Sequence, residues 1–258
     1  RDNLIYGITG SGKTEIYMQL IDVTLKQGKS SIMLVPEISL TPQTIDRFIA
    51  RFGKSIAVLH SKLSPGERFD EWQKIKNDEV KIVVGARSAI FAPIKKLGII
   101  IIDEEHDLSY KSEMTPRYNA KDLAYYMAKK NNIPLVLGSA TPDIVSFYHA
   151  KESLLGLEKN KIINLHVLTK RANNAVLPDS KVVDMRLELA QGNKSMLSQE
   201  LKSAIEKNIK NKEQTILFLN RRGFSTFIMC RDCGYVANCP NCNISLTYHK
   251  YQNILKIS

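Results

Sequence analysis

Eight residues near the N-terminus constrain the fold of this chain more than any other stretch. Residues 7–14 read Gly-Ile-Thr-Gly-Ser-Gly-Lys-Thr and fit the phosphate-binding loop pattern G-x-x-x-x-G-K-[ST]. The apolar residues before the loop predict a buried strand, and residues 13–26 after it predict a helix. Because a chance loop rich in Gly, Ser and Thr would lack these flanking elements, the sequence favours a nucleoside triphosphate site in an α/β fold.

The loop supplies the groups that a bound triphosphate needs. Its glycines let successive backbone N–H groups turn toward an anion, and the helix that begins near Lys13 adds the positive end of its dipole. Lys13 can reach the β- and γ-phosphates, and the Thr14 hydroxyl can ligate Mg²⁺. The predicted ATP contacts are Gly7, Thr9, Gly10, Ser11, Gly12, Lys13 and Thr14.

A second stretch places carboxylates at the end of a strand. Residues 98–102 are apolar throughout, as in a parallel strand covered on both faces, and Asp-Glu-Glu-His follows at 103–106. Ligand sites in such sheets lie at the carboxyl ends of the strands. We therefore expect Asp103 to hold Mg²⁺, directly or through water, and Glu104 to polarise the attacking water. Glu105 and His106 are expected to report the nucleotide state. A solvated acidic turn is the alternative, and the loop upstream disfavours it.

The order of apolar runs predicts the fold class. Residues 1–155 alternate strand patterns (4–7, 31–35, 56–59, 81–84, 98–102, 135–137) with helix patterns (13–26, 42–52, 65–76, 120–130), which indicates a doubly wound parallel sheet. In the first helix, the spacing of Ile16, Leu20 and Val23 predicts the buried stripe. Residues 156–195 are expected to be a connector. A partial second α/β lobe is expected over 196–229, with a helix at 196–211 and a strand at 214–219.

Composition narrows the partners and the compartment. The chain has 258 residues and a net charge of +11, which favours an anionic partner such as nucleic acid, although a lysine-rich surface explains the charge equally well. No apolar run is long enough to cross a membrane, and no signal peptide is visible. Because the chain opens with Arg1 rather than Met, we expect it to be a piece of a longer polypeptide.

The four cysteines form two C-x-x-C pairs, Cys230 with Cys233 and Cys239 with Cys242. Nothing else in the sequence suggests secretion, so zinc binding is favoured over disulfides. The spacing leaves open which cysteines share an ion. Residues 230–258 are therefore predicted to be a zinc-binding segment.

Other strand ends and loops carry groups suited to DNA. Tyr rings can stack on bases, while Lys, Arg and Ser can meet phosphates. The candidate DNA contacts are Ser39, Arg87, Ser88, Tyr110, Lys111, Arg117 and Tyr118. The candidates for coupling nucleotide state to DNA are His106, Ser139 and Thr141. Taken singly, each stretch is equally well an ordinary turn or surface loop.

Six sequence blocks occur in a distinctive order. They are residues 7–15, 34–43, 59–68, 84–93, 103–106 and 138–142, with the aromatic-rich stretch 109–124 and Leu-Asn-Arg-Arg-Gly-Phe-Ser at 219–225 before the paired cysteines. Together they resemble the PriA family of primosomal replication restart helicases over essentially the whole chain. Each block is short, and it is their combination that makes the resemblance specific.

The resemblance implies a superfamily-two helicase that uses ATP to move 3′ to 5′ on DNA during replication restart and primosome assembly at stalled forks. It implies that Lys13 and Thr14 bind phosphate and Mg²⁺, that Asp103 holds the metal and that Glu104 is the catalytic base. Residues 110–118 would couple single-stranded DNA to hydrolysis. The implied partners are single-stranded and forked DNA, helicase-loading proteins and single-strand-binding protein, in the bacterial cytoplasm at the nucleoid and not at a membrane.

The chain departs from the family at both ends. The family carries a DNA-binding region before the phosphate-binding loop, two further cysteine pairs and later second-lobe motifs, including an arginine that completes the ATP site. In the family the first pair shares zinc with the fourth, and the second with the third. Each pair here is therefore expected to be half of a zinc site in a central fragment. The alternatives are a non-catalytic fragment that binds nucleotide and DNA, or another DNA translocase with a phosphate-binding loop.

Overall fold

The computed structural model describes residues 2–155, 163–172, 178–218, 230, 233, 235–242, 246–249 and 254–256. The chain divides into two units, Arg1–Leu177 and Pro178–Ser258. The first unit contains the phosphate-binding loop and the acidic strand end. The second contains all four cysteines.

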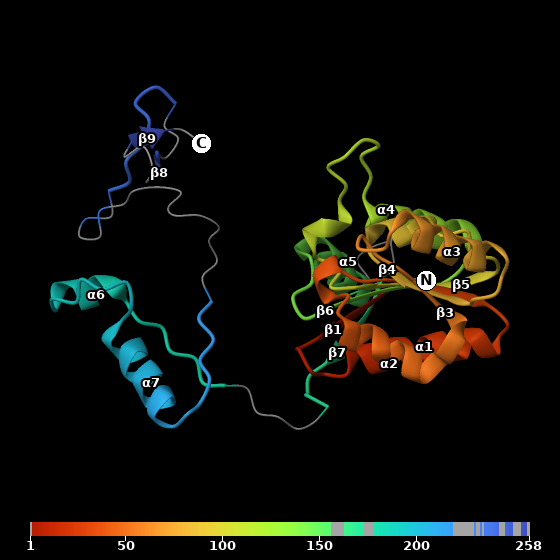
Figure 1. The fold of residues 1–258 in the computed structure, drawn as a ribbon, viewed down its shortest axis with the longest axis horizontal. Coiled ribbons are helices and arrows are strands. Elements are labelled where there is room, and N and C mark those ends of the chain that lie inside the picture. Colours follow the sequence, from red (N-terminus) through yellow and green to blue (C-terminus); the bar gives the residue numbers. More distant parts are fainter. Residues whose placement is uncertain are drawn as a thin grey trace. The chain divides into compact units, whose positions relative to one another are not determined.

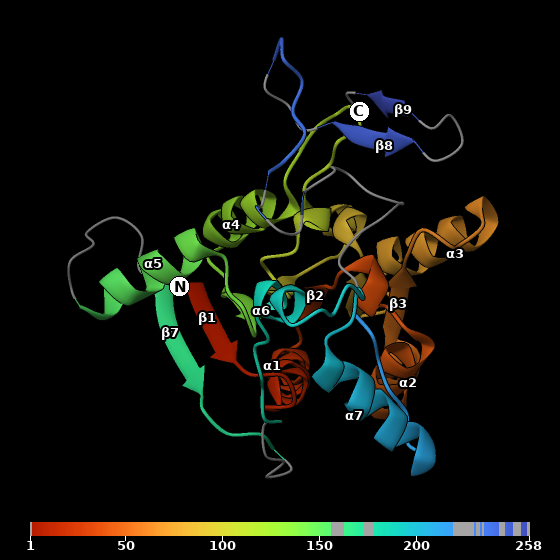
Figure 2. The ribbon, with the colours of Figure 1, turned by 90° about the vertical axis from the view of Figure 1, so that its left-hand side faces the viewer.

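The first unit is a seven-stranded sheet in the order β3-β4-β2-β5-β6-β1-β7, and every strand pair in it is parallel. The strands are β1 (Asp2–Gly7), β2 (Ser30–Leu34), β3 (Ile56–Leu59), β4 (Ile82–Gly85), β5 (Leu97–Asp103), β6 (Leu135–Ser139) and β7 (Ile163–Leu168). Figure 2 shows β7 beside β1 at one edge of the sheet. The predicted doubly wound parallel sheet is confirmed.

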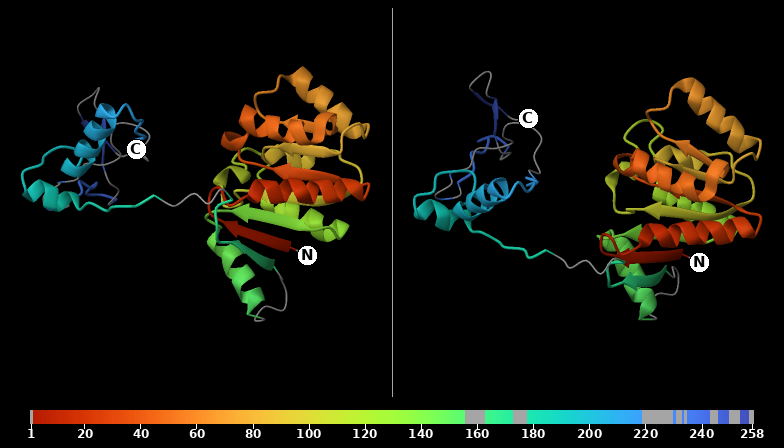
Figure 3. Two further views of the ribbon diagram at one scale, coloured as in Figure 1. Left: turned by 90° about the horizontal axis from the view of Figure 1, so that it is seen from below. Right: turned by 60° about the horizontal axis from the view of Figure 1, so that its bottom comes forward.

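Helices cover both faces of this sheet (Figures 1 and 3). One face carries α1 (Lys13–Lys26) and α2 (Pro42–Phe52), and the other carries α3 (Pro65–Lys76), α4 (Ala120–Asn131) and α5 (Ile144–Leu154). Short 3-10 turns follow several strands, at Glu37–Ser39, Gly53–Ser55, Arg87–Phe91 and Leu108–Tyr110. Because all strands are parallel, their carboxyl ends meet at one edge, where the loops can share a site.

Strand β5 lies near the middle of the sheet and is buried on both faces. Ile99 and Ile101 pack on the α1 and α2 face, and Ile100 and Ile102 pack on the opposite face. Burying an isoleucine side chain stabilises the fold by roughly 1.5–3 kcal/mol. These contacts fix the position of Asp103, the last residue of the strand, at the carboxyl edge.

The buried stripe of α1 differs from the predicted one. The buried stripe consists of Tyr17, Ile21 and Thr24, each one residue after a member of the predicted stripe. Val23, which belongs to the predicted stripe, is 52% exposed. Both stripes have helical spacing, so periodicity alone did not separate them. The shift matters because it turns Tyr17 toward the carboxyl end of β5.

The range expected to be a connector contains part of the sheet. Strand β7 pairs with β1 along its whole length, and α5 precedes it. Its pattern Ile-Asn-Leu-His-Val-Leu is that of an edge strand, with only Ile163 fully buried. The connector between the units therefore begins later than the sequence analysis expected.

The second unit contains α6 (Met185–Ala190), α7 (Gln199–Lys210) and an antiparallel pair, β8 (Thr247–His249) with β9 (Ile254–Lys256). Helix α7 occupies the helix expected at 196–211. Residues 214–218 form no strand, and among the described residues no neighbouring strand pairs with them. The remainder of that expected lobe, 219–229, lies outside the described residues. In the part of the chain that the structure describes, no helix combines the length and the apolar character needed to cross a membrane.

Candidate nucleotide-binding site

The phosphate-binding loop and the acidic strand end open into one cavity. This cavity has a volume of about 510 Å³ and lies at the carboxyl edge of the sheet. Its lining joins β5, the loop after β1 and the helices α1 and α2: Thr9, Gly10, Gly12, Lys13, Thr14, Glu15, Met18, Arg47, Asp103 and Glu104. Lys13 and Glu104, about ninety residues apart in sequence, thus face the same space.

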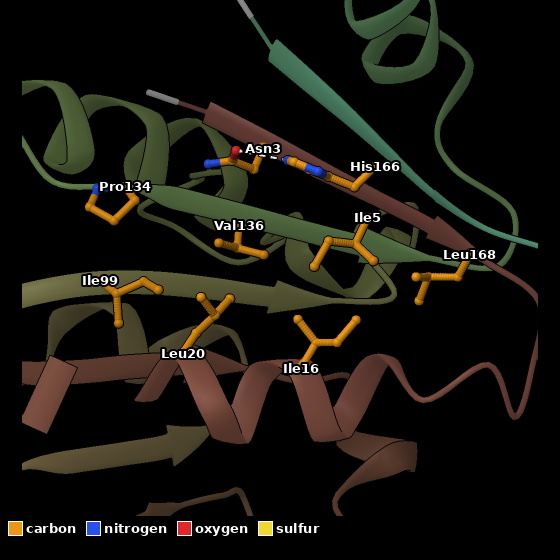
Figure 4. Close-up of a pocket in the computed structure, with 9 residues that line it drawn as sticks. All are labelled: Asn3, Ile5, Ile16, Leu20, Ile99, Pro134, Val136, His166 and Leu168. Carbon is orange, nitrogen blue, oxygen red and sulfur yellow. Dashed lines mark hydrogen bonds between the residues drawn. The ribbon is translucent and has the colours of Figure 1, made fainter. Parts of the chain in front are cut away.

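A second cavity adjoins α1 but has a different character (Figure 4). It measures about 410 Å³ and lies between Ile16 and Leu20 of α1 and the strands β1, β5, β6 and β7. Its lining is apolar apart from Asn3 and His166, whose side chains lie 3.1 Å apart, Oδ1 to Nε2. Because it holds neither carboxylate nor lysine, it does not suit a triphosphate.

The loop from Gly7 to Thr14 has the shape of an anion cradle. Gly10 and Gly12 have φ values of 81° and 93°, in the left-handed region that glycine tolerates best. Helix α1 begins at Lys13 without a side-chain cap, so its first N–H groups are left to face a ligand. The buried Ser11 hydroxyl has no hydrogen-bond partner among the described residues. These features fit a bound phosphate.

Lys13 is held inside the loop. Its side chain is buried, and Nζ donates a hydrogen bond of 2.8 Å to the carbonyl of Gly7. A single carbonyl leaves two of the three ammonium donors for other acceptors. The ammonium is therefore poised beside the cradle.

Asp103 is fixed by two tyrosines. The Tyr17 hydroxyl donates to its Oδ1 at 2.9 Å, and the Tyr110 hydroxyl donates to its backbone carbonyl at 2.6 Å. Burial, followed by the charge of Glu104, raises the pKa of the Asp103 carboxyl, while the bond from Tyr17 opposes this shift. Together with the Thr14 hydroxyl, this carboxylate offers the oxygen ligands that Mg²⁺ takes, so the residues present fit that ion.

Glu104 adopts an unusual backbone conformation beside the cavity. Its φ is 45°, and its carbonyl accepts the N–H of Asp107 at 2.9 Å. Positive φ is uncommon outside glycine and marks a position that its surroundings must hold. The side chain is 33% exposed, so a water molecule can reach it.

The three coupling candidates lie together. His106 Nδ1 is 2.8 Å from the Ser139 hydroxyl, and its Nε2 is 3.4 Å from the Thr141 hydroxyl. The Ser139 hydroxyl also accepts the N–H of Thr141 at 2.9 Å, and Nδ1 lies 3.6 Å from Oε2 of Glu104. This cluster joins the acidic loop, residues 104–106 directly after β5, to the loop after β6.

The aromatic-rich stretch forms a hairpin over residues 111–119, which projects beyond α4 (Figure 1). Lys111 pairs with Asn119, and the N–H of Ser112 donates to the Tyr118 carbonyl at 2.7 Å. Lys111 and Arg117 are exposed on it and Tyr118 is half-buried. The hairpin therefore presents the Lys111 and Arg117 cations to solvent near its base.

Two DNA candidates have other contacts. Tyr110 is only 2% exposed, so its ring offers no face to a base, contrary to the prediction. Arg87 donates from Nη1 to the carbonyls of Ser109 and Lys111, at 3.1 and 2.7 Å, and its guanidinium lies 5.8 Å from the Tyr118 ring centroid. Ser88 is exposed and Ser39 is half-buried.

Four residues in or beside the nucleotide cavity were not predicted: Glu15, Met18, Arg47 and Tyr17. Arg47 lines the cavity from α2, where the ion pair of Arg51 with Glu15 at 2.7 Å ties α2 to α1. Tyr17 reaches Asp103 from α1. No motif marks Arg47, but the helical spacing of Tyr17 with Lys13 and Ile21 was visible in the sequence.

The four cysteines lie in the second unit, and Cys239 is the buried one among them. Among the described residues, no three His, Cys, Asp or Glu side chains gather as metal ligands. Hydrogen bonds from the backbone of Asn241 and Cys242 lower the pKa of the Cys239 thiol. Zinc binds the thiolate, so this shift at Cys239 is in the direction that favours metal binding.

Comparison with known families decides the assignment. The profile of the DEAD/DEAH box helicase family matches residues 1–147, more than half of the chain. The chain belongs to this helicase family. A second profile, the PriA DNA helicase Cys-rich region domain, matches residues 239–256, which include Cys239 and Cys242.

Curated relatives confirm the resemblance to PriA. Replication restart protein PriA of Bacillus subtilis is 54% identical over 98% of this chain, and that of Synechocystis is 47% identical over 96%. The chain spans 30% of the length of each of these relatives. Among solved structures, the Hef helicase domain of Pyrococcus furiosus is similar over 64% of this chain and 35% of its own, with 23% identity and a TM-score of 0.42.

Proposed function

We propose that this chain carries the ATP-binding lobe of a DNA-stimulated ATPase that moves 3′ to 5′ and separates strands during replication restart. One observation carries the proposal: Lys13 and Glu104 line the same cavity. The similarity to PriA relatives supports the choice of DNA and of replication restart. Fork DNA, helicase-loading proteins, single-strand-binding protein and a cytoplasmic, nucleoid-associated location belong to the same proposal.

The residues of the cavity divide the chemistry among them. The N–H groups at the start of α1 and the Lys13 ammonium would bind the β- and γ-phosphates, after Nζ leaves the Gly7 carbonyl. Thr14 and Asp103 would hold Mg²⁺, which neutralises phosphate charge when bound. Glu104 would accept a proton from the attacking water. Each role uses a side chain that lines this one space.

The DNA contacts are proposed on exposure and charge. Lys111 and Arg117 on the hairpin and Ser39 and Ser88 at the ends of β2 and β4 would meet phosphates. Arg87 would act mainly by holding the hairpin base. The cysteine pairs would each contribute to a zinc site.

The test is ATP hydrolysis by the protein as its gene encodes it, with and without single-stranded DNA. We expect DNA to raise kcat in the wild type and Lys13→Ala to abolish hydrolysis. Lys26→Ala is the matched control, since Lys26 lies on the same helix and its side chain is 74% exposed. An ATPase rate that ignores DNA, or a Lys13→Ala variant as active as the control, would contradict the proposal.

Nucleotide binding without turnover is the second candidate for these 258 residues alone. Residues 214–218 favour this candidate, because they do not form the strand expected to begin the second lobe. Their apolar side chains stay in solvent, with Ile216 93% and Phe218 85% exposed. Single-turnover hydrolysis by the 258-residue chain separates the two. Release of phosphate from bound ATP would eliminate the binding-only function.

A further inference from the structure

Glu105 is the residue of the acidic run that faces away from the nucleotide cavity. Its side chain is fully buried, and both of its carboxylate oxygens accept hydrogen bonds. Oε1 accepts the N–H of Asp143 at 2.7 Å. Oε2 accepts from the Ser146 hydroxyl at 3.1 Å and from Lys121 Nζ at 2.9 Å.

The partners of Glu105 begin two different helices. Lys121 is the second residue of α4, which starts directly after the 111–119 hairpin and is capped by the Asn119 side chain. Asp143 caps α5, which starts directly after the loop that follows β6 and contains Thr141. One carboxylate thus ties the acidic loop to the hairpin exit and to the loop after β6.

The Glu105–Lys121 ion pair is expected to contribute little net stability to the fold. The Lys121 side chain is 16% exposed and that of Glu105 is 0% exposed, so both charges lose most of their water. Desolvation of a buried pair often cancels its attraction, and apolar residues of similar volume can be as stabilising. What the pair adds is a fixed geometry between α4 and the acidic loop.

We propose that the Glu105–Lys121 ion pair is the positioning link through which the hairpin sets the placement of Glu104. This proposal rests on the proposed function. Single-stranded DNA on the hairpin shifts the start of α4 and with it Lys121. Because both carboxylate oxygens and the backbone N–H of Glu105 are held by hydrogen bonds, the shift passes to its backbone and so to the adjacent Glu104. The positive φ of Glu104 makes its carboxylate direction sensitive to such a DNA-induced shift, whereas without DNA no shift is passed along the pair.

Lys121→Met tests the link, because methionine keeps much of the apolar stem and removes the charge. The protein as its gene encodes it is assayed for kcat and KM for ATP with and without oligothymidylate. Anisotropy measures the oligothymidylate Kd. We expect basal kcat, KM and DNA affinity to match the wild type. We expect DNA stimulation to fall about tenfold, within the usual range for coupling between sites.

Matched variants separate the link from charge and folding effects. Lys129→Met removes a charge from the same helix without touching Glu105 and should keep full stimulation. Lys121→Arg should restore part of it. The double variant Glu105→Gln/Lys121→Met leaves no unpaired buried charge, so it should lose stimulation while unfolding at nearly the wild-type midpoint.

Full DNA stimulation in both Lys121→Met and the double variant would overturn the proposal. An equal loss of basal and stimulated kcat in Lys121→Met would also overturn it, because the pair would then support catalysis without transmitting anything. A wild type that DNA does not stimulate would instead remove the proposed function, and that result is visible before any variant is compared.

Discussion

The Tyr17 hydroxyl donates a 2.9 Å hydrogen bond to Oδ1 of Asp103, and so ties the helix after the phosphate-binding loop to the acidic end of β5. The contact depends on a third residue, Gly138 at the neighbouring end of β6. A Cβ at Gly138 would lie 1.6 Å from the Tyr17 hydroxyl oxygen. The glycine of the Gly-Ser-Ala-Thr-Pro stretch is thus needed for space beside the Asp103 carboxylate.

Gly138→Ala should therefore destabilise the protein and displace Tyr17 from Asp103. Overpacking of a tight core costs about 1–3 kcal/mol, and the closeness of this overlap places the expected cost at the upper end. Urea unfolding measures the change. The double variant Gly138→Ala/Tyr17→Phe removes the hydroxyl and should recover part of the loss; no recovery would contradict the steric explanation.

Asp103→Asn should stabilise the protein at neutral pH in the absence of nucleotide. The pKa of Asp103 is raised in the folded state, by burial and then by the charge of Glu104. Such a group contributes stability that is fully present below the unfolded-state pKa of about 3.8 and is lost as pH rises through the folded-state pKa. Asparagine keeps an acceptor for Tyr17 without the charge, so it avoids that loss.

The measurement is the free energy of unfolding of both proteins across the acidic to neutral range. The advantage of the Asn variant should be smallest at the acidic end and should grow as pH rises. Asp46→Asn, at an exposed position of α2, is the control and should show no such growth. An advantage that shrinks with rising pH would contradict the direction of the Asp103 shift.

Arg87→Ala should loosen the hairpin without weakening nucleotide binding. The variant loses two hydrogen bonds from a charged donor to the carbonyls of Ser109 and Lys111. Bonds of this kind are worth about 1.5–3 kcal/mol, so amide exchange in residues 111–119 should speed up roughly tenfold or more. Arg87→Lys should give an intermediate rate. Unchanged exchange would show that the hairpin base is held by other contacts.

The sequence predicted the elements that carry strong local signals. Helices α1, α2 and α3 have the expected bounds, and α3 begins with a full capping box between Ser64 and Glu67. These ends are fixed by glycine, proline and capping chemistry within a few residues, which a sequence displays directly.

Elements set by tertiary packing were harder to predict. Helix α5 leaves Ile144 82% and Val145 57% exposed, so its apolar residues do not mark a single stripe. Its cap, Asp143, was the usable signal, since its side chain accepts the N–H of Val145 and of Ser146. The alternation in β7 was the other available signal.

The site was predicted best where a motif assigns the chemistry. Of the predicted residues, Thr9, Gly10, Gly12, Lys13 and Thr14 of the loop meet Asp103 and Glu104 at one cavity. The roles of Tyr110 and Arg87 were harder to predict. The residue type of Tyr110 suggested stacking on a base, but its hydroxyl bonds to the Asp103 carbonyl. The residue type of Arg87 suggested a phosphate contact, but its guanidinium bonds to the hairpin at Lys111. Only three-dimensional contacts separate a bracing arginine from a binding one.

The central claim is that Lys13 and Glu104 act on the same bound triphosphate. Its most direct test compares Mg·ATP affinity and hydrolysis in Glu104→Gln with the wild type, in the protein as its gene encodes it. We predict unchanged ATP affinity and a fall in kcat of about 10²–10⁴-fold, the usual contribution of a general base. Hydrolysis by Glu104→Gln at the wild-type rate would contradict the account.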